Sequence, residues 1–305
     1  MNILRESVVH PHASLRFLNM RLEAFRGQRH RHHHAELTWI EHGSGLRSVG
    51  DAVQPFDDGD LVLVGSEVPH HWLSAAGVPR PRGALLRATT LQFAPDLCLR
   101  PALPELGQGA ALLRRARRGL RIQGGTQAQV IRHLLAMREA DDLARLAHLL
   151  AILSCLQLGG DDLVPIASAA ASPVGPAHEV GAVPGGASPA DRGGEPQRRI
   201  DKVVDWMHQR LAQPITVAQA AQVAHVSPAA FSRFFKREVG RTFTQYLNDA
   251  RCGEAWLRLQ HTREPVAAIA HSCGFTTLSH FNEQFRRRHG VSPRALRSEG
   301  RRSGR

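Results

Sequence analysis

Apolar residues in the last third of the chain recur at helical spacing. One stripe at i, i+3 and i+7 consists of Leu278, Phe281 and Phe285. Thr276 or Thr277 can cap the start of this helix through a side-chain oxygen. Gly290 ends it after three arginines, which suit the negative end of the helix dipole. A short helix from Pro265 comes just before it, across a Gly-Phe turn. Two short helices joined by a tight glycine turn are typical of a helix-turn-helix.

The same pattern occurs earlier in the chain, at an offset of 49 or 50 residues. The repeat covers both helices and the turn between them, so it supports the motif more strongly than one match does. Matching positions are Val217 with Val266, Ala221 with Ala270, Val226 with Phe275, Phe231 with Phe281, Phe235 with Phe285, Lys236 with Arg286 and Gly240 with Gly290.

Residues 198–296 resemble the double helix-turn-helix DNA-binding domain of the AraC/XylS family of bacterial transcription regulators. The second unit carries the signature of that family: Gly-Phe, the Ser-His-Phe-Asn core, Phe-Arg and Gly-Val-Ser-Pro. The resemblance implies a DNA-binding domain over residues 198–298 with promoter DNA as its partner, and RNA polymerase as a further partner if the protein is an activator. We expect residues 198–305 to fold and bind DNA alone.

The outward face of each second helix predicts the residues that read bases. They are Ala229, Ser232, Arg233 and Lys236 in the first unit, and Ser279, Asn282, Glu283 and Arg286 in the second. Arginine can make a bidentate contact to guanine, and asparagine suits adenine. Glu283 can accept from cytosine or weaken its half of the site. Arg241, Arg287 and Arg288 are predicted to contact phosphate, which adds affinity without sequence information.

Capping boxes and one long helix connect these units. Thr216 with Gln219, and Thr242 with Gln245, have the spacing of a capping box. The second box starts a helix from Phe243 to about residue 261, which would be about 27 Å long. That length is near one turn of DNA, about 34 Å, so both reading helices can enter successive major grooves. A first helix is predicted over residues 198–213, and a disordered tail over residues 298–305.

Residues 15–95 lack helical periodicity and predict an antiparallel barrel. Short apolar runs such as LTWIEH, DLVLVG and RATTLQF are separated by glycine and aspartate turns. This spacing is typical of a small barrel or jelly roll. The stretch also resembles the cupin-type sugar-sensor barrel found in front of many AraC-type regulators, in the His-x-His-x-x-x-Glu run that starts at His30 and in PFDDGDLVLVGSEVPHHW. It departs from the cupin motifs at Ala24, Gly65, Glu67 and Ser74.

The cupin resemblance implies a site inside the barrel, which we assign to residues 1–103. The residues that hold a metal in cupin enzymes correspond to His30, His32, Glu36 and His70. Such donors suit Fe, Mn, Ni or Zn. We expect His30 and His32 to lie on one strand and share a face. Three alternatives stay open: a divalent metal, a pocket that binds a small-molecule effector, or structure alone. The predicted effector site adds Trp39 and Trp72, which are alternatively plain core.

Residues 104–163 turn helical, and residues 164–197 are predicted to form a flexible linker. One stripe carries Leu112, Leu113, Ala116 and Leu120, with four arginines outside it that we interpret as a solvated face. Gly124-Gly125 is expected to break the helix, Thr126 to cap a second and Asp141-Asp142 to begin a third. In the resembling family such helices form a dimer interface, and an intramolecular layer is the alternative. The linker is rich in Pro, Gly and Ala and has no period.

The net positive charge of the chain is concentrated in its C-terminal third. Residues 198–305 hold 19 Lys and Arg against 8 Asp and Glu, an excess of 11 out of the net +12. A basic third with this motif favours nucleic acid as partner. Four scattered cysteines indicate a reducing cytoplasm, and no apolar run is long and uncharged enough to span a membrane.

The sequence thus predicts an α+β protein: a cupin-like barrel with a helical segment, a flexible linker and an all-α double helix-turn-helix domain. Its predicted function is a cytoplasmic, homodimeric transcription regulator that senses a small molecule. We expect no catalytic residues, and no cofactor apart from the divalent metal left open above. The alternative is a metal-dependent cupin enzyme fused to a DNA-binding module.

Overall fold

The N-terminal half of the chain forms two antiparallel sheets. The computed structural model describes residues 14–25, 29–75, 78, 85–99, 103–168 and 189–303. Within them, the larger sheet has the strand order β1-β7-β2-β5-β8-β9 and the smaller sheet β4-β3-β6. The strands are β1 (Leu15–Leu22), β2 (Ala35–His42), β3 (Gly45–Val49), β4 (Ala52–Phe56), β5 (Leu61–Val64), β6 (His70–Ser74), β7 (Leu86–Phe93), β8 (Leu120–Ile122) and β9 (Leu163–Pro165). The prediction of β structure within residues 15–95 is confirmed.

Side chains of the larger sheet alternate between two cores, because successive residues of a strand point to opposite faces. The inner core lies between the two sheets and contains Ile40, Val62, Val64, Leu86 and Ala88 with Val49, Ala52, Phe56 and Trp72. The outer core lies on the other face of the larger sheet and contains Leu37, Leu61, Leu63, Leu91 and Phe93. The polar residues considered below belong to the inner core.

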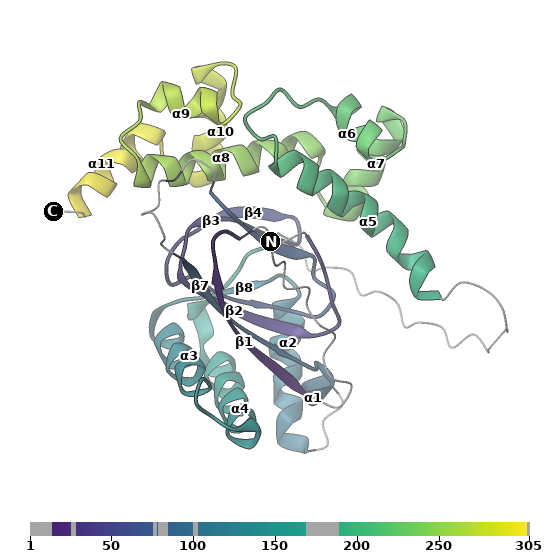
Figure 1. Ribbon diagram of the computed structural model, residues 1–305, viewed down its shortest axis with the longest axis vertical. Coiled ribbons are helices and arrows are strands. Elements are labelled where there is room, and N and C mark those ends of the chain that lie inside the picture. The colour runs from purple at the N-terminus through teal and green to yellow at the C-terminus, as the bar shows by residue number, and fades with distance from the viewer. Residues whose placement is uncertain are drawn as a thin grey trace.

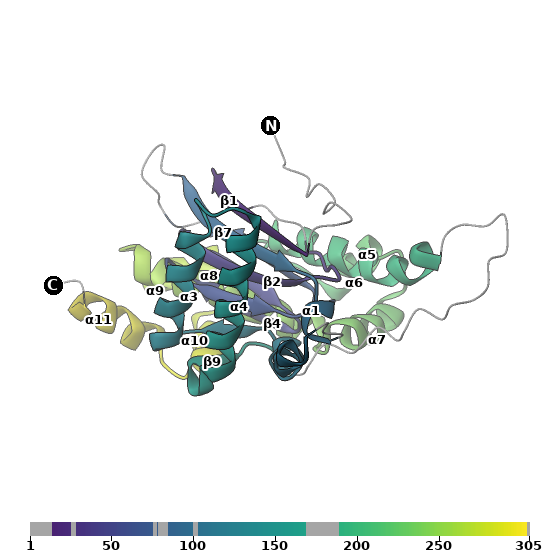
Figure 2. The ribbon, with the colours of Figure 1, turned by 90° about the horizontal axis from the view of Figure 1, so that it is seen from below.

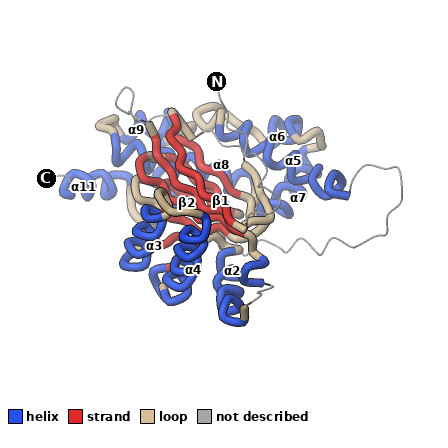
Figure 3. Tube along the Cα trace, turned by 60° about the horizontal axis from the view of Figure 1, so that its bottom comes forward, coloured by secondary structure: helices blue, strands red, loops and turns tan. Residues whose placement is uncertain are grey.

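A layer of helices covers the outer face of the larger sheet. These elements are α1 (Asp96–Leu99), the 3-10 turns η1 (Pro104–Gln108) and η2 (Gly160–Asp162), α2 (Gly109–Ala116), α3 (Gly124–Ala136) and α4 (Asp142–Leu158). Figures 1 and 3 show α2, α3 and α4 together on one side of the strands. Leu149, Ile152, Leu153 and Leu156 of α4 are buried against this sheet. The helices therefore form an intramolecular layer, which was one of the two alternatives for this segment.

Several predicted boundaries in this region are wrong. Leu120 lies in β8 rather than on a helical stripe, and Gly124-Gly125 begins α3 instead of breaking a helix. Asp141-Asp142 does begin α4, as predicted, and Asp141 caps it by accepting from the backbone N–H of Ala144. The predicted linker starts inside β9, and Val164 pairs with Arg121 of β8. Three-residue strands are too short to show alternation, so the sequence does not reveal β8 or β9.

The C-terminal part is all helical. It contains α5 (Pro189–His208), α6 (Val217–Val223), α7 (Pro228–Val239), α8 (Phe243–His261), α9 (Val266–Ser272), α10 (Leu278–His289) and α11 (Pro293–Ser303). Both predicted capping boxes are confirmed. Gly240 and Gly290 end α7 and α10 with φ of 83° and 75°, in the left-handed region that glycine adopts without strain. Thr277 caps α10.

Three expectations for this part need correction. Helix α5 begins at Pro189, within the predicted linker, because its apolar stripe starts only near Ile200 and leaves the first turns without a period. The predicted disordered tail continues α11 to Ser303. Leu278 is 36% exposed, since it lies in the first turn of α10 beyond the core that holds Phe281 and Phe285. The middle of the linker, 169–188, lies outside the described residues.

The helical part packs on the smaller sheet through α8. Leu46 of β3 and Val53 of β4 join the core formed by α5, α6, α7 and α8. Figure 1 shows α8 lying across β3 and β4. Gly253 sits at the closest approach, where a Cβ would come 2.6 Å from Cδ2 of Leu46. The absence of a side chain at this position therefore lets α8 approach the barrel.

No helix among the described residues combines the length and the apolar character needed to cross a membrane. The four cysteines are free thiols, with Cys98, Cys252 and Cys273 buried and Cys155 half-buried. Burial raises the pKa of Cys252 and of Cys273 to about 12, so neither thiol is ionised near neutral pH.

Candidate DNA-reading face and barrel site

Helix α7 places the predicted reading residues of the first unit on its exposed face. Ser227 caps the helix by accepting from the backbone N–H of Ala230, and Pro228 occupies the first position. Phe231 and Phe235 are fully buried against α8. The exposed residues of the opposite face are Ala229, Ser232, Arg233 and Lys236. The hydroxyl of Ser232 donates to the carbonyl of Pro228 at 3.1 Å.

Helix α10 repeats this arrangement in the second unit. Phe281 and Phe285 are fully buried, and Trp256 of α8 stacks on Phe285. The exposed residues of the opposite face are Ser279, Asn282, Glu283 and Arg286. Figure 2 shows α7 and α10 toward the same edge of the molecule. Within the described residues, the barrel covers neither reading face.

The predicted phosphate contacts divide into two groups. Arg287 remains exposed and donates to the side-chain oxygen of Gln284. Arg241, by contrast, lies 3.2 Å from the carboxylate of Asp51 in the barrel and 2.7 Å from Asp249. Arg288 donates to the backbone carbonyl of Val53 at 2.7 Å. In this arrangement Arg241 and Arg288 hold the helical part against the barrel.

Four residues predicted from the cupin motifs converge in the barrel. One ligand atom from each of His30, His32, Glu36 and His70 lies within 4.8 Å of the others. His30 forms an isolated antiparallel bridge with His70, the first residue of β6. His32 precedes β2, so the expectation that both histidines lie on one strand is wrong. Their rings still meet, with centroids 5.7 Å apart.

Hydrogen bonds fix how two of these imidazoles face the carboxylate of Glu36. Nδ1 of His70 lies 2.8 Å from the carbonyl oxygen of Val68, and Nδ1 of His32 lies 3.0 Å from that of His34. A carbonyl only accepts, so each Nδ1 carries the proton. The Nε2 atoms of His32 and His70 then face Glu36 at 3.1 and 3.6 Å. A lone pair facing a carboxylate is unfavourable, so each Nε2 needs a proton or a shared cation.

Glu36 itself is well supported as a carboxylate. Its oxygens accept from the hydroxyl of Thr38 at 2.7 Å and from the side-chain amide of Gln92 at 3.0 Å. Burial favours a raised pKa for Glu36, but the charge of His70 and the hydrogen bonds of His32 and His70 outweigh it and hold this pKa well below its usual range. The arrangement can hold a divalent cation, with imidazole nitrogens and one carboxylate as donors.

The two tryptophans predicted beside this site lie on different faces. Trp72 of β6 is in the inner core, with its ring 5.7 Å from that of His70. Successive residues of β2 point to opposite faces of the sheet, so Trp39 points away from the face that carries Glu36 and Thr38. It packs against the outer helical layer, where the guanidinium of Arg138 lies 5.9 Å from its ring. The expectation that Trp39 shares the barrel interior is therefore wrong.

The neighbours of the histidine cluster form a polar contact with the helical part, which the sequence did not indicate. Arg29, one residue before His30, is 3% exposed and donates to Asp201 of α5 at 2.9 Å. Its backbone N–H also donates to Asp205 at 3.3 Å. His71, one residue after His70, is 1% exposed, and its ring lies 5.1 Å from that of His208. On both strands of the bridge, the histidine (His30 or His70) therefore points into the barrel, and the adjacent residue (Arg29 or His71) points toward α5.

Tyr246 completes this contact between barrel and helices. It is fully buried in α8 and its hydroxyl lies 2.7 Å from that of Ser48 in β3. Burial raises the pKa of Asp205 to about 6, and burial together with the charge of Arg29 lowers the pKa of His208 to about 3. His208 is therefore neutral in the folded protein at any pH above about 4.

We expect the change His208→Phe to reduce the acid sensitivity of the protein. The unfolded His has a pKa near 6.5 and the folded one about 3, so the stability that His208 contributes above pH 6.5 is lost as the pH falls. Between about pH 7 and pH 5 the native protein should lose about 2 kcal/mol more of its unfolding free energy than the variant. Urea titrations at both pH values measure this difference. Equal losses in the two proteins would contradict the buried neutral imidazole.

Comparison with known proteins identifies a helix-turn-helix domain within the C-terminal helical part. Residues 220–299 match the family described as "Helix-turn-helix domain". The HTH-type transcriptional activator RhaS of Enterobacter sp. (strain 638) is 35% identical over 99 residues, which are 32% of this chain and 36% of that protein. The uncharacterized HTH-type transcriptional regulator YobQ of Bacillus subtilis (strain 168) is 30% identical over 95 residues, 31% of this chain and 39% of that protein. The chain thus spans little more than a third of these curated relatives.

Among solved structures, the DNA-binding domain of AdpA in complex with a target DNA is 30% identical, covers 34% of this chain and 95% of that chain, and superposes with a TM-score of 0.34. The two units, their caps and the sequence matches define a helix-turn-helix DNA-binding domain at the C-terminus. The relatives RhaS and YobQ are named as HTH-type transcription regulators.

Proposed function

We propose that the chain is a sequence-specific transcription regulator in which the barrel senses a small ligand and the AraC-type domain reads promoter DNA. The observation that carries DNA reading is the pair of exposed faces on α7 and α10, each backed by two buried phenylalanines. The HTH-type regulators RhaS and YobQ are 35% and 30% identical to the chain over 99 and 95 residues. In the cell we place the protein in the cytoplasm as a homodimer, with RNA polymerase as a partner if it activates.

The barrel is proposed to be cupin-like, with its effector site at the histidine cluster. The two antiparallel sheets and the convergence of His30, His32, Glu36 and His70 support this assignment. We propose that these four residues hold a divalent transition metal ion, because two Nε2 atoms face one carboxylate. A bound ion would supply the positive charge that the carboxylate and the ring nitrogens share. Trp72 borders the site, and Trp39 is not part of it.

The same residues suggest how binding in the barrel reaches the DNA-binding domain. A ligand that moves His30 or His70 also moves Arg29 or His71, because each pair is adjacent in the chain and points to opposite sides. Arg29 and His71 contact α5. The ligand therefore biases whether α5 and α8 stay packed on the barrel, through its different affinity for the two arrangements.

The two kinds of arginine in the DNA-binding domain should behave differently. Arg233 lies in the middle of α7 opposite Phe231 and Phe235, so Arg233→Ala should remove a base contact and weaken binding to the preferred site by about 1 to 3 kcal/mol. Arg287 lies near the end of α10, and Arg287→Ala should weaken binding to all sequences about equally. A duplex selected by the native protein from a random pool, and a scrambled duplex of equal length, measure both effects.

Arg237→Ala is a suitable control for Arg233→Ala. Arg237 is also exposed on α7, one helical turn beyond Arg233, but its guanidinium already pairs with Glu238 at 2.8 Å. If Arg233→Ala weakened the selected and the scrambled duplex to the same extent, the reading face of α7 would be misassigned.

A further inference from the structure

Helices α3 and α4 of the outer layer bring two histidines together. His133 lies in the last turn of α3, and His148 lies in the second turn of α4. Their Nδ1 atoms are 3.2 Å apart and their ring centroids 5.4 Å apart. Figures 1 and 2 both show the two helices side by side. Both side chains are half-buried, so solvent reaches the pair.

The distance between the two nitrogens suits two ligands of one metal ion. An imidazole nitrogen binds an ion such as Zn²⁺ at about 2.0 to 2.1 Å. Two such bonds at octahedral or tetrahedral angles place the nitrogens about 2.9 to 3.4 Å apart. The observed distance of 3.2 Å lies within this range. An ion can therefore replace the proton that the two Nδ1 atoms otherwise share, with little movement of either helix.

Packing of the two helices fixes where these imidazoles lie. Leu134 of α3 and Leu149 of α4 are buried in the outer core, and each directly follows one of the two histidines. Each imidazole thus lies at the rim of a buried apolar stripe, where the backbone is held on the sheet. Because the two ligands are already in place, binding of an ion orders few additional groups.

The protonation of His133 also favours metal binding. An imidazole has to be neutral to act as a ligand. Burial lowers the pKa of His133, and the nearby His148 and Arg132 lower it further. Arg132 itself is exposed, so water screens its charge. Near neutral pH a proton therefore competes only weakly with an ion for this nitrogen.

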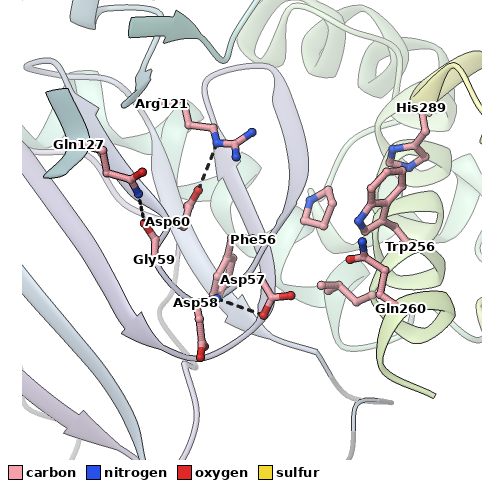
Figure 4. A pocket seen from close by; sticks show the side chains of 12 residues that line it. Phe56, Asp57, Asp58, Gly59, Asp60, Arg121, Gln127, Trp256, Gln260 and His289 are labelled. Carbon is pink, nitrogen blue, oxygen red and sulfur yellow. Dashed lines mark hydrogen bonds and ion pairs between the residues drawn. The ribbon is translucent and has the colours of Figure 1, made fainter. Parts of the chain in front are cut away.

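Two other histidine sites lack this combination of features. His71 and His208 also meet, but the charge of the buried Arg29 acts on both rings and opposes a cation. His289 packs against Trp256, with ring centroids 4.6 Å apart, on the wall of a pocket of about 400 Å³ between barrel and helices. Figure 4 shows His289 as the one histidine among the residues that line this pocket. Neither site offers a cation two imidazoles away from a buried positive charge.

We propose that His133 and His148 bind one divalent transition metal ion, such as Ni²⁺, Zn²⁺ or Cu²⁺, with water in the remaining coordination positions. Imidazole is a ligand that suits all three ions. Within the described residues, the barrel cluster is the group with three or more potential ligands. The site on α3 and α4 has two, so it should bind an ion more weakly than the barrel cluster does. It is independent of the proposed DNA reading.

A bound ion would connect α3 to α4 next to an existing anchor on the barrel. Arg138 follows α3 and donates to Glu41 of β2 at 2.5 Å. Strand β2 also carries Glu36 of the barrel cluster. The ion would therefore restrain the end of α3 that is attached to this strand, and separation of α3 from α4 would become rarer.

Hydrogen exchange of the full-length protein, with a chelator and with Ni²⁺, tests this site. At a Ni²⁺ concentration about a hundred times the dissociation constant, amides that exchange when α3 and α4 separate should exchange about a hundredfold more slowly. His148→Gln should remove this slowing, because an amide side chain is a poor ligand for these ions. Without ion the variant should exchange almost like the native protein, since glutamine can still hydrogen-bond to His133.

Three further variants serve as controls. His70→Ala changes the barrel cluster and should keep the slowing in α3 and α4. Gln129 is exposed one turn before His133, and Gln129→Ala keeps both imidazoles, so it should keep the slowing as well. His133→Gln repeats the test from the other helix if His148→Gln does not fold, which circular dichroism detects.

Each contrary outcome overturns the site for a different reason. If Ni²⁺ did not slow exchange in α3 and α4 of the native protein, at any concentration that keeps it in solution, no ion would bind there. Slowing that persisted in both glutamine variants would exclude the two histidines as ligands. Slowing that disappeared in His70→Ala would assign the effect to the barrel cluster. None of these results involves DNA, so the proposed regulator would stand in every case.

Discussion

The change Arg29→Met is expected to release the DNA-binding domain from the barrel. Arg29 is 3% exposed and bonds Asp201 at 2.9 Å, while its backbone N–H reaches Asp205. Removal of one partner of a buried ion pair costs about 3–5 kcal/mol, because the other charge stays buried without compensation. Asp201 would lose this ion pair, and Asp205, whose pKa is already raised to about 6 by burial, would keep the backbone N–H of residue 29 but lose the nearby positive charge.

Hydrogen exchange and limited proteolysis can measure this release. Amides of α5 should lose protection in Arg29→Met, whereas amides of β2 and β7 should not. Arg31→Met is the matched control, since Arg31 lies two residues on, is 28% exposed and is 3.8 Å from Glu67. Surface pairs of this kind contribute about 0–1 kcal/mol. Equal loss of protection in both variants would mean that Arg29 does not hold the domains together.

The change His70→Ala is expected to abolish tight metal binding by the barrel. Its Nε2 faces Glu36 at 3.6 Å and its Nδ1 is anchored to the carbonyl of Val68. Even residues that only hold a metal ligand in place are worth roughly 10- to 100-fold in affinity, so loss of a ligand should weaken binding by about a hundredfold or more. Calorimetric titration with Zn²⁺ and with Ni²⁺ alone measures this directly.

The control for this experiment is His33→Ala. His33 is exposed and is not among the four residues that converge, so its removal should leave metal affinity unchanged. Native protein that binds neither ion, or binds both equally well after His70→Ala, would leave the cluster as the centre of a metal-free pocket. Because Nδ1 of His32 and of His70 each donates to a backbone carbonyl, their Nε2 atoms would then need protons of their own to face Glu36.

Local features of the DNA-binding domain were predictable because they depend on neighbours in the chain. The caps at Thr216, Ser227 and Thr242 and the left-handed residues Gly240 and Gly290 follow from the chemistry of helix ends. The internal repeat added the placement of the buried phenylalanines. The signals for the caps and for the left-handed glycines lie within a few residues of the structure that they determine.

Features that depend on distant partners were not predictable. Arg29 and Asp201 are 172 residues apart, and nothing near either one marks it as buried. Arg241 and Arg288 resemble phosphate contacts in sequence, yet Asp51 and Val53 of the barrel bind them here. The barrel site was predicted in part. Its four converging residues follow from the motif resemblance. The position of Trp39 was predicted wrongly, although alternation along β2 places it on the face opposite Glu36.

Gly253 shows how closely the two parts of this chain are adapted to each other. Glycine inside a helix is less favourable than alanine by about 1 kcal/mol, so α8 on its own would gain from a side chain there. The barrel does not permit one, because Leu46 occupies the space. A chimera that joins residues 189–305 to a different sensor keeps this weak point in the helix but not the surface that requires it. The modules of the protein are therefore not freely interchangeable.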